Sequence, residues 1–196
     1  HQRPKIEEYG DSLFVVLHTV EFLGDELSIG ELDVFVGPNF VLSVRNRTRK
    51  GFHDVRARCE AEPELLRFGS GYVLYALMDA VVDRYIPALD ALETRLERIE
   101  EEIFGGRLAR ANIESLYALK QNLMTLKHAA SPLLDAAGKL YGGRVPHVCA
   151  GMGEYFRDVI DHLVRLNATV DSIRDMVSTA MNVNVSLVSL QANEVA

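Results

Sequence analysis

Asp158 and His162 stand four residues apart in a segment whose apolar spacing predicts a helix. Residues at this spacing lie on one helix face, so the carboxylate and the imidazole could chelate a divalent cation. Asp161 lies between them, and Arg157 and Arg165 are close neighbours. With those arginines nearby, ordinary ion pairing explains the spacing better than a metal site does. Mg²⁺ would fit only if water molecules completed its octahedral shell.

A second group of acidic residues occupies an earlier segment of helical pattern. The stretch from Asp79 to Glu102 holds eight acidic and three basic residues, a balance of −5 in a chain whose formal charge is −7. Asp79 and Asp83 are four residues apart and place like charges on one helix face. Such acidity is typical of a solvated coiled-coil face, and it would also attract divalent cations.

The sequence carries no motif typical of an enzyme. It has no G-x-S-x-G, no P-loop and no H-E-x-x-H, and its many helix-end glycines are explained by capping. His18 lies in an apolar run, where a packed histidine is the ordinary interpretation. Cys59 and Cys149 form no C-x-x-C pair, which excludes a zinc finger and predicts two reduced thiols. The acidic balance argues against nucleic-acid binding. We therefore expect a protein that is not an enzyme.

The elements that must position these residues differ between the two halves of the chain. From Ser12 to about Arg47, β-branched and aromatic runs predict strands, and a Gly-Pro-Asn turn joins the last two as a hairpin. Residues 52–60 predict a short helix, and a connection marked by proline and glycine follows over residues 63–71. The fold class expected is α+β.

Beyond residue 71 the pattern is helical and long. Apolar residues recur at heptad spacing without a slip, at Met78, Val82, Tyr85, Leu89, Leu92, Leu96, Ile99 and Ile103. Pro87 is expected to bend this helix or remove one hydrogen bond without ending it. A second seam, which should pair antiparallel with the first, comprises Ile113, Leu116, Leu123, Leu126, Ala130 and Leu133. A third helix is predicted from Glu154 to the C-terminus.

The end of that third helix is uncharged and polar. Ser178, Asn182, Ser189 and Asn193 fall on one face, with apolar residues beside them. The stripe fits a helix that packs against copies of itself around a wet axis, and it also fits a helix half-buried against another neighbour. The uncharged stretch from Met176 to Asn193 contains eight polar residues, so it is not expected to cross a membrane.

Four segments resemble the CorA family of magnesium and cobalt transporters over essentially the whole chain. They are QRPKIEEYGDSLFVVL, YVLYALMDAVVDRYIPALDALE, EYFRDVIDHLVRL and the closing SLQANEV. Proteins of the family continue from this Asn-Glu-Val into transmembrane helices. The resemblance implies a funnel-shaped homopentamer on the cytoplasmic side of the cell membrane, attached to it through those helices.

The resemblance also implies roles for individual residues. In the family, Mg²⁺ bound between the cytoplasmic domains of neighbouring subunits keeps the pore closed. Matched by motif, Asp158 is a regulatory ligand between subunits, whose acidic partner lies upstream of this chain, and Asp79 is near a second regulatory site. Together with these two, Asp83 and His162 complete the candidate metal residues. The candidate pore-lining residues are Asn193 at the membrane entrance, Ser189, and Asn182 in place of an aspartate ring.

The expected organisation has three parts. Residues 1–70 are the C-terminal part of an α/β domain that is incomplete at its N-terminus, residues 71–153 are two long antiparallel helices, and residues 154–196 are a stalk helix leading towards the membrane. Mg²⁺ is the expected ion, with Co²⁺, Ni²⁺ and Zn²⁺ open. A ZntB-like zinc transporter and a soluble coiled-coil module without an ion role are the alternatives.

Overall fold

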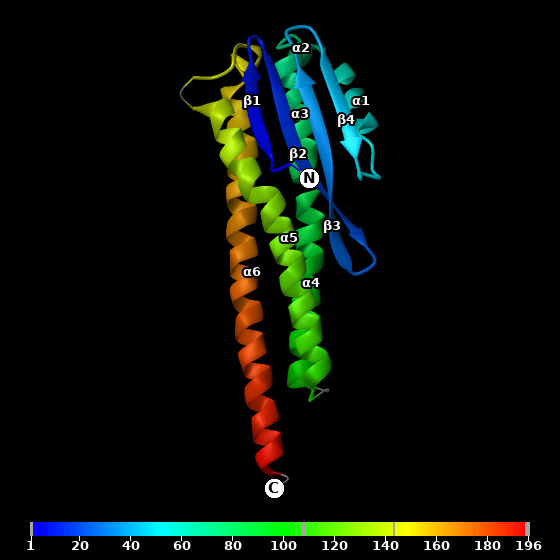
Figure 1. Ribbon diagram of the computed structural model, residues 1–196, viewed down its shortest axis with the longest axis vertical. Coiled ribbons are helices and arrows are strands. Elements are labelled where there is room, and N and C mark those ends of the chain that lie inside the picture. The colour runs from blue at the N-terminus through cyan, green and yellow to red at the C-terminus, as the bar shows by residue number, and fades with distance from the viewer. Residues whose placement is uncertain (1, 107–108, 143, 195–196) are drawn as a thin grey trace.

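The structure, a computed structural model, describes residues 2–106, 109–142 and 144–194. One sheet packs against a layer of long helices (Figure 1). Its antiparallel strands follow in chain order: β1 (Lys5–Tyr9), β2 (Ser12–Leu23), β3 (Glu26–Val36) and β4 (Val41–Asn46). The helices are α1 (His53–Ala61), α2 (Pro63–Leu66), α3 (Ser70–Asp83), α4 (Tyr85–Phe104), α5 (Ala109–Tyr141) and α6 (Gly153–Glu194), with a short 3₁₀ helix, η1 (His147–Cys149), before α6. The expected α+β class is confirmed.

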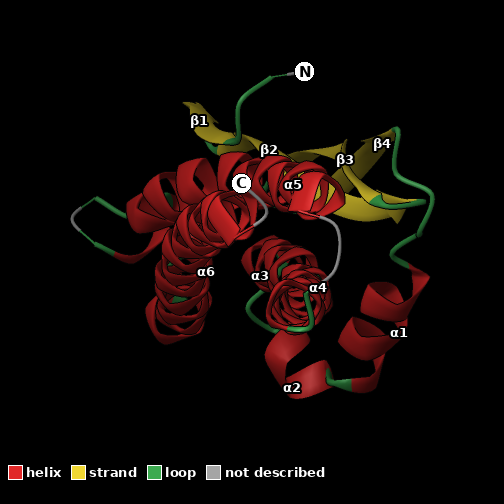
Figure 2. Cartoon of the chain, turned by 90° about the horizontal axis from the view of Figure 1, so that it is seen from below, coloured by secondary structure: helices red, strands yellow, loops and turns green. Residues whose placement is uncertain are grey.

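The sheet buries one face against the helices because its apolar side chains alternate with the pleat. Val15 and Leu17 of β2 pair in register with Val34 and Leu32 of β3, and all four are fully buried. Figure 2 shows α5 lying along this face of the sheet. The predicted hairpin is present as β3 and β4. The strand β1 was not predicted, because only Ile6 in it is a buried apolar residue.

The first long helix is interrupted at Arg84, which separates α3 from α4. Pro87 has no backbone N–H to donate to the carbonyl of Asp83, four residues earlier, so the hydrogen-bond ladder is broken there. We expected a bend without an end; the structure instead has two helices that lie end to end along the long axis (Figure 1). All eight residues of the first heptad seam are buried, which confirms that seam. Tyr85 also donates a hydrogen bond from its hydroxyl to the backbone carbonyl of His18.

The helices α5 and α6 pack side by side, and α6 extends beyond the other helices at its C-terminal end (Figure 1). The second seam is confirmed from Leu116 onward. The prediction was wrong for the first residue of this seam: Ile113 is 40% exposed, and the neighbouring Asn112 is buried in its place. None of the helices formed by the described residues is both long and apolar enough to cross a membrane.

A close backbone contact fixes the start of α3 beside the start of α6. Gly71 lies against η1, and a Cβ atom at this position would stand 2.2 Å from the carbonyl oxygen of Val148. Only glycine allows this approach. Because η1 leads directly into α6, the contact sets the relative position of the two helices that carry the candidate site.

Candidate metal site

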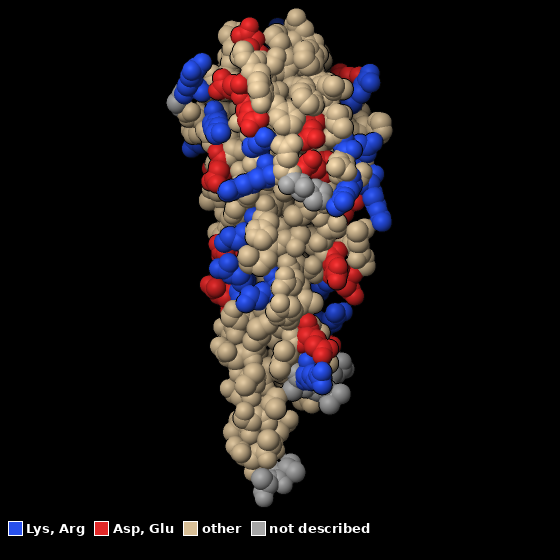
Figure 3. All heavy atoms as spheres, in the orientation of Figure 1, with Lys and Arg blue, Asp and Glu red and all other residues tan. Residues whose placement is uncertain are grey.

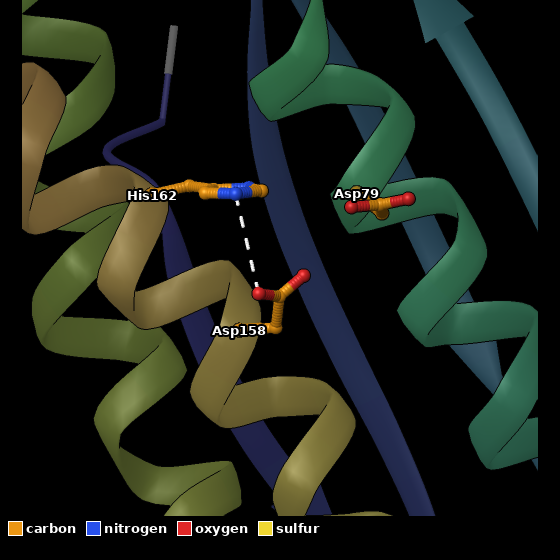
Figure 4. Close-up of side chains that lie close together, drawn as sticks. All are labelled: Asp79, Asp158 and His162. Carbon is orange, nitrogen blue, oxygen red and sulfur yellow. Dashed lines mark ion pairs between the residues drawn. The ribbon is translucent and has the colours of Figure 1, made fainter.

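Three potential metal ligands come together between α3 and α6. Asp79 lies on α3, and Asp158 and His162 lie on α6, with one ligand atom of each within 4.8 Å of the others. Figure 4 shows the two carboxylates and the imidazole directed into the space between the helices. Because Asp158 and His162 are one helical turn apart, they meet Asp79 from the same face of α6.

Asp79 is the most enclosed member of the cluster and has a cationic partner. Its residue is 7% exposed, and its Oδ2 atom accepts a hydrogen bond from Nη1 of Arg58 at 2.7 Å. The hydrogen bond to this carboxylate raises the pKa of Arg58 further above its ordinary value. The buried charge of Asp79 is therefore compensated within the chain.

Asp158 is the open side of the cluster. Its side chain is 57% exposed, and its Oδ1 atom lies 4.0 Å from Nε2 of His162. The carboxylate therefore keeps oxygen atoms accessible from solvent. An ion could enter the space between the helices from this side.

The two ring nitrogens of His162 have different surroundings. Nε2 faces Asp158, whereas Nδ1 is buried and has no hydrogen-bond partner among the described residues. A histidine that binds a metal through one nitrogen carries its proton on the other, which usually donates to a carboxylate or carbonyl. Here that N–H would be buried without an acceptor. The geometry therefore favours a proton on Nε2, which can donate towards Asp158 or towards water bound to an ion.

Asp83 borders the cluster one turn further along α3. It is exposed, yet partial desolvation and the negative charge of Asp79 raise the pKa of its carboxyl group above the usual value. The nearby His162 and Arg58 act in the opposite direction. Asp83 thus adds negative charge beside the cluster and is not one of the three residues whose ligand atoms come together.

The donor set fits a hydrated hard cation. Mg²⁺ binds oxygen at about 2.1 Å, so ligands on opposite sides of the ion are about 4.2 Å apart. The ligand atoms lie within 4.8 Å of one another, which is compatible with an ion that retains water molecules as part of its shell. Asp79, Asp83 and Asp158 carry three negative charges near the single guanidinium that pairs with Asp79, and a divalent cation would neutralise the excess.

The structure therefore brings together two aspartates that the resemblance assigned to separate sites. Asp79 and Asp158 share one cluster within a single chain. Sequence reasoning missed Arg58, which lies in the predicted short helix and has no spacing signal that connects it to Asp79. It also missed Tyr75. The centre of its ring lies 5.8 Å from Cζ of Arg58 and 5.2 Å from the ring centre of Tyr155 on α6.

The polar stripe of α6 lies at the far end of the molecule from this cluster. Its four members, Ser178, Asn182, Ser189 and Asn193, are all exposed, and so are Val185 and Val188 beside them. Figure 3 shows that the lower end of α6 carries no lysine, arginine, aspartate or glutamate on the visible face. The single chain thus leaves an uncharged helix face of mixed polarity without a partner in the part of the chain described.

Comparison with known proteins places this arrangement in context. The sequence model of the family described as CorA-like Mg²⁺ transporter protein matches residues 1–196. The cobalt/magnesium transport protein CorA of Thermotoga maritima is 32% identical over 198 residues, which cover 100% of this chain and 56% of that protein. The Bacillus subtilis protein YfjQ is 31% identical over 200 residues, 99% of this chain and 60% of that protein. The chain thus spans a little over half the length of these relatives.

Solved structures share the fold. The soluble domain of CorA from Methanocaldococcus jannaschii superimposes with a TM-score of 0.80 at 18% identity, covering 95% of this chain and 75% of that one. The complete CorA magnesium transporter from the same organism superimposes with a TM-score of 0.85 at 19% identity, covering 98% of this chain and 61% of that one. The ZntB cytoplasmic domain from Vibrio parahaemolyticus is less similar, with a TM-score of 0.60 at 12% identity and coverage of 93% and 72%.

Proposed function

The chain belongs to the CorA-like Mg²⁺ transporter family, and from that membership we propose that it is the cytoplasmic regulatory part of a divalent-cation transporter. In this proposal the cluster of Asp79, Asp158 and His162 binds Mg²⁺ and reports its concentration to the pore. The observation that carries the proposal is the approach of Asp79 on α3 to Asp158 on α6.

An ion at this position would add a link between α3 and α6, beyond the packing of Tyr75 on Tyr155. Without it, the two carboxylates repel each other across the gap, because like charges at this distance interact unfavourably. With it, α3 and α6 are held together near the start of α6. Since a ligand shifts an equilibrium only through its different affinity for two states, Mg²⁺ would favour the state in which the cluster is closed.

The proposed ligands are the carboxylates and water. Asp79 and Asp158 contact the ion or its inner water molecules, Asp83 adds charge, and His162 donates from Nε2 to Asp158 or to an ion-bound water. The exposed side of Asp158 leaves room for a carboxylate of a neighbouring subunit, as the resemblance implies. Oxygen and water ligands suit Mg²⁺, and Co²⁺, Ni²⁺ and Zn²⁺ are the alternative ions.

We further propose that α6 continues towards a membrane pore in a homopentamer. Asn182, Ser189 and Asn193 would line its axis, because hydrated cations need an uncharged or negative polar lining. The exposed apolar residues Val185 and Val188 would then contact neighbouring subunits. The exposure of both sets in the single chain supports this assignment.

The proposal is tested in the longer protein that includes the membrane segments. Mg²⁺ flux into liposomes is measured as a function of Mg²⁺ on the cytoplasmic side for the wild type and for Asp79→Asn/Asp158→Asn. We expect the double variant to conduct while losing most of its inhibition by Mg²⁺. Normal inhibition in the double variant would refute the sensor. No ion response in any variant would favour the coiled-coil module.

A further inference from the structure

Arg58 forms an ion pair with one member of the candidate site, Asp79. It reaches Asp79 from α1, an element that carries none of the proposed ligands, and donates a hydrogen bond of 2.7 Å to Oδ2. Asp79 is almost enclosed, with a side chain 10% exposed, whereas the Arg58 side chain is 39% exposed. The guanidinium also lies 5.8 Å from the ring centre of Tyr75.

The ion pair with Arg58 compensates the negative charge of the buried Asp79. A carboxylate that is nearly enclosed and lies near two further aspartates needs a compensating positive charge. Arginine supplies that charge at every physiological pH, because its guanidinium does not lose its proton. The ion-free site is therefore already neutralised in part, and a divalent cation must compete with a charge that is permanently present.

We propose that Arg58 is an internal counter-ion that holds Asp79 when no divalent cation is bound and leaves it when one binds. This inference rests on the proposed function, since it requires that the cluster binds a divalent cation. Arg58 is a positioning residue that sets the affinity of the site without being a ligand.

The coupling would extend to α1. Val55 and Cys59 are the buried residues of this helix, and the ion pair between Arg58 and Asp79 adds a polar attachment to α3. Asp54 adds a longer contact of 3.7 Å to Arg84. Release of Arg58 on ion binding would loosen α1 and make Cys59, the residue next to Arg58, easier to reach from solvent. Because coupling is reciprocal, removal of Arg58 would tighten ion binding.

The first measurement is the affinity of the chain for Mg²⁺ and Co²⁺ by calorimetric titration. We expect Arg58→Gln to bind both ions about tenfold more tightly, a difference of ~1.4 kcal/mol. Arg58→Lys, which keeps the positive charge, should return the affinity towards the wild-type value. Arg56→Gln is the matched control, because Arg56 lies on the same helix and, among the described residues, forms an exposed ion pair with Glu60 alone. An Arg58→Gln affinity equal to or weaker than that of Arg56→Gln overturns the proposal.

The second measurement needs no variant and keeps the test decisive if Arg58→Gln does not fold. The alkylation rate of Cys59 by iodoacetamide is followed by mass spectrometry with and without Mg²⁺, with the fully buried Cys149 as the internal reference. We expect Mg²⁺ to accelerate the reaction of Cys59 severalfold and to leave Cys149 unchanged. If the chain binds Mg²⁺ but the reaction of Cys59 is unchanged or slower, the counter-ion role of Arg58 is overturned and the proposed function is not. Absence of Mg²⁺ and Co²⁺ binding to the wild-type chain overturns both this inference and the proposed function.

Discussion

Asp79 of α3 and Asp158 of α6 direct their carboxylates into one space, although they lie on helices separated in sequence by α4 and α5. Their surroundings differ, because Asp79 is enclosed and paired with Arg58 while Asp158 is largely exposed. One carboxylate is thus fixed and the other is accessible. In the proposed site, an ion would therefore enter from the side of Asp158 and finish against Asp79.

His162 is expected to support the ion without binding it directly. In His162→Gln the amide can still donate a hydrogen bond towards Asp158, so the Mg²⁺ affinity should stay within about threefold of the wild type, less than ~0.7 kcal/mol. The measurement is a calorimetric Mg²⁺ titration of the two chains. A loss as large as that of Asp158→Asn would make His162 a direct ligand.

His18 should make the stability of the fold depend on pH. Burial lowers the pKa of its imidazole below the ordinary value, although the hydrogen bond to the carbonyl of Gln2, with Nε2 at 2.6 Å, opposes this in part. The unfolded chain therefore binds a proton at a higher pH than the folded chain, and the contribution of His18 to stability is lost as pH falls below about 6.5.

That dependence is measured by urea unfolding between pH 7.5 and pH 5. The slope due to one group cannot exceed about 1.4 kcal/mol per pH unit. The free energy of unfolding of His18→Gln should fall less steeply over this range than that of the wild type. The exposed His128→Gln should follow the wild type. Parallel curves for the wild type and His18→Gln would exclude this role for His18.

The helical half of the fold could be predicted because its heptad spacing is a local property of the sequence. Every seam position from Met78 to Ile103 is buried, and the interruption at Arg84 did not move the seam. The exposed Ile113 shows the weakness of such reasoning at a helix end, where few neighbours remain to cover an apolar side chain.

The site was less accessible to sequence reasoning than the fold. The spacing of Asp158 and His162 on one helix was visible, but their distance to Asp79 depends on how α3 packs beside α6. That packing rests on contacts such as Gly71 against Val148, which no local pattern reveals. Arg58 was missed for the same reason, because its partner lies on another element.

Asn122 should link the helices to the sheet at a measurable cost when it is lost. It is buried on α5, its Oδ1 accepts the N–H of Leu27 at 2.8 Å, and its Nδ2 donates to the carbonyl of Asp25 at 2.9 Å. Asn122→Leu should lower the free energy of unfolding by about 2 to 4 kcal/mol, because it leaves both backbone groups without this partner.

Chemical unfolding measures that cost. Gln121→Leu, at the exposed neighbouring position, should change the free energy of unfolding by less than about 0.5 kcal/mol. The increment in stability produced by Mg²⁺ should be the same in both variants. A smaller increment in Asn122→Leu would mean that this contact and the metal site are coupled.

In the proposed pentamer, the polar stripe of α6 is expected to line the pore. Asn182→Cys and Asn193→Cys should react with a small cationic thiol reagent faster after Mg²⁺ is removed, because an open pore is more accessible. Leu187→Cys lies on a half-buried position of the same helix and should not respond. Equal rates at all three positions in both conditions would assign this face to an ordinary packing contact.

The most direct test of the proposed site is the stabilisation of the chain by Mg²⁺, followed as the melting temperature during a Mg²⁺ titration. At a hundredfold excess over Kd, a ligand specific for the folded state adds about 2.7 kcal/mol. For a chain of this size that corresponds to a rise of roughly 5 to 10 °C. The wild type and Asp161→Asn, a control at an exposed position of α6, should show this rise, whereas Asp79→Asn and Asp158→Asn should lose most of it. An equal rise in all four proteins would contradict the assignment of Asp79 and Asp158 as the ion site.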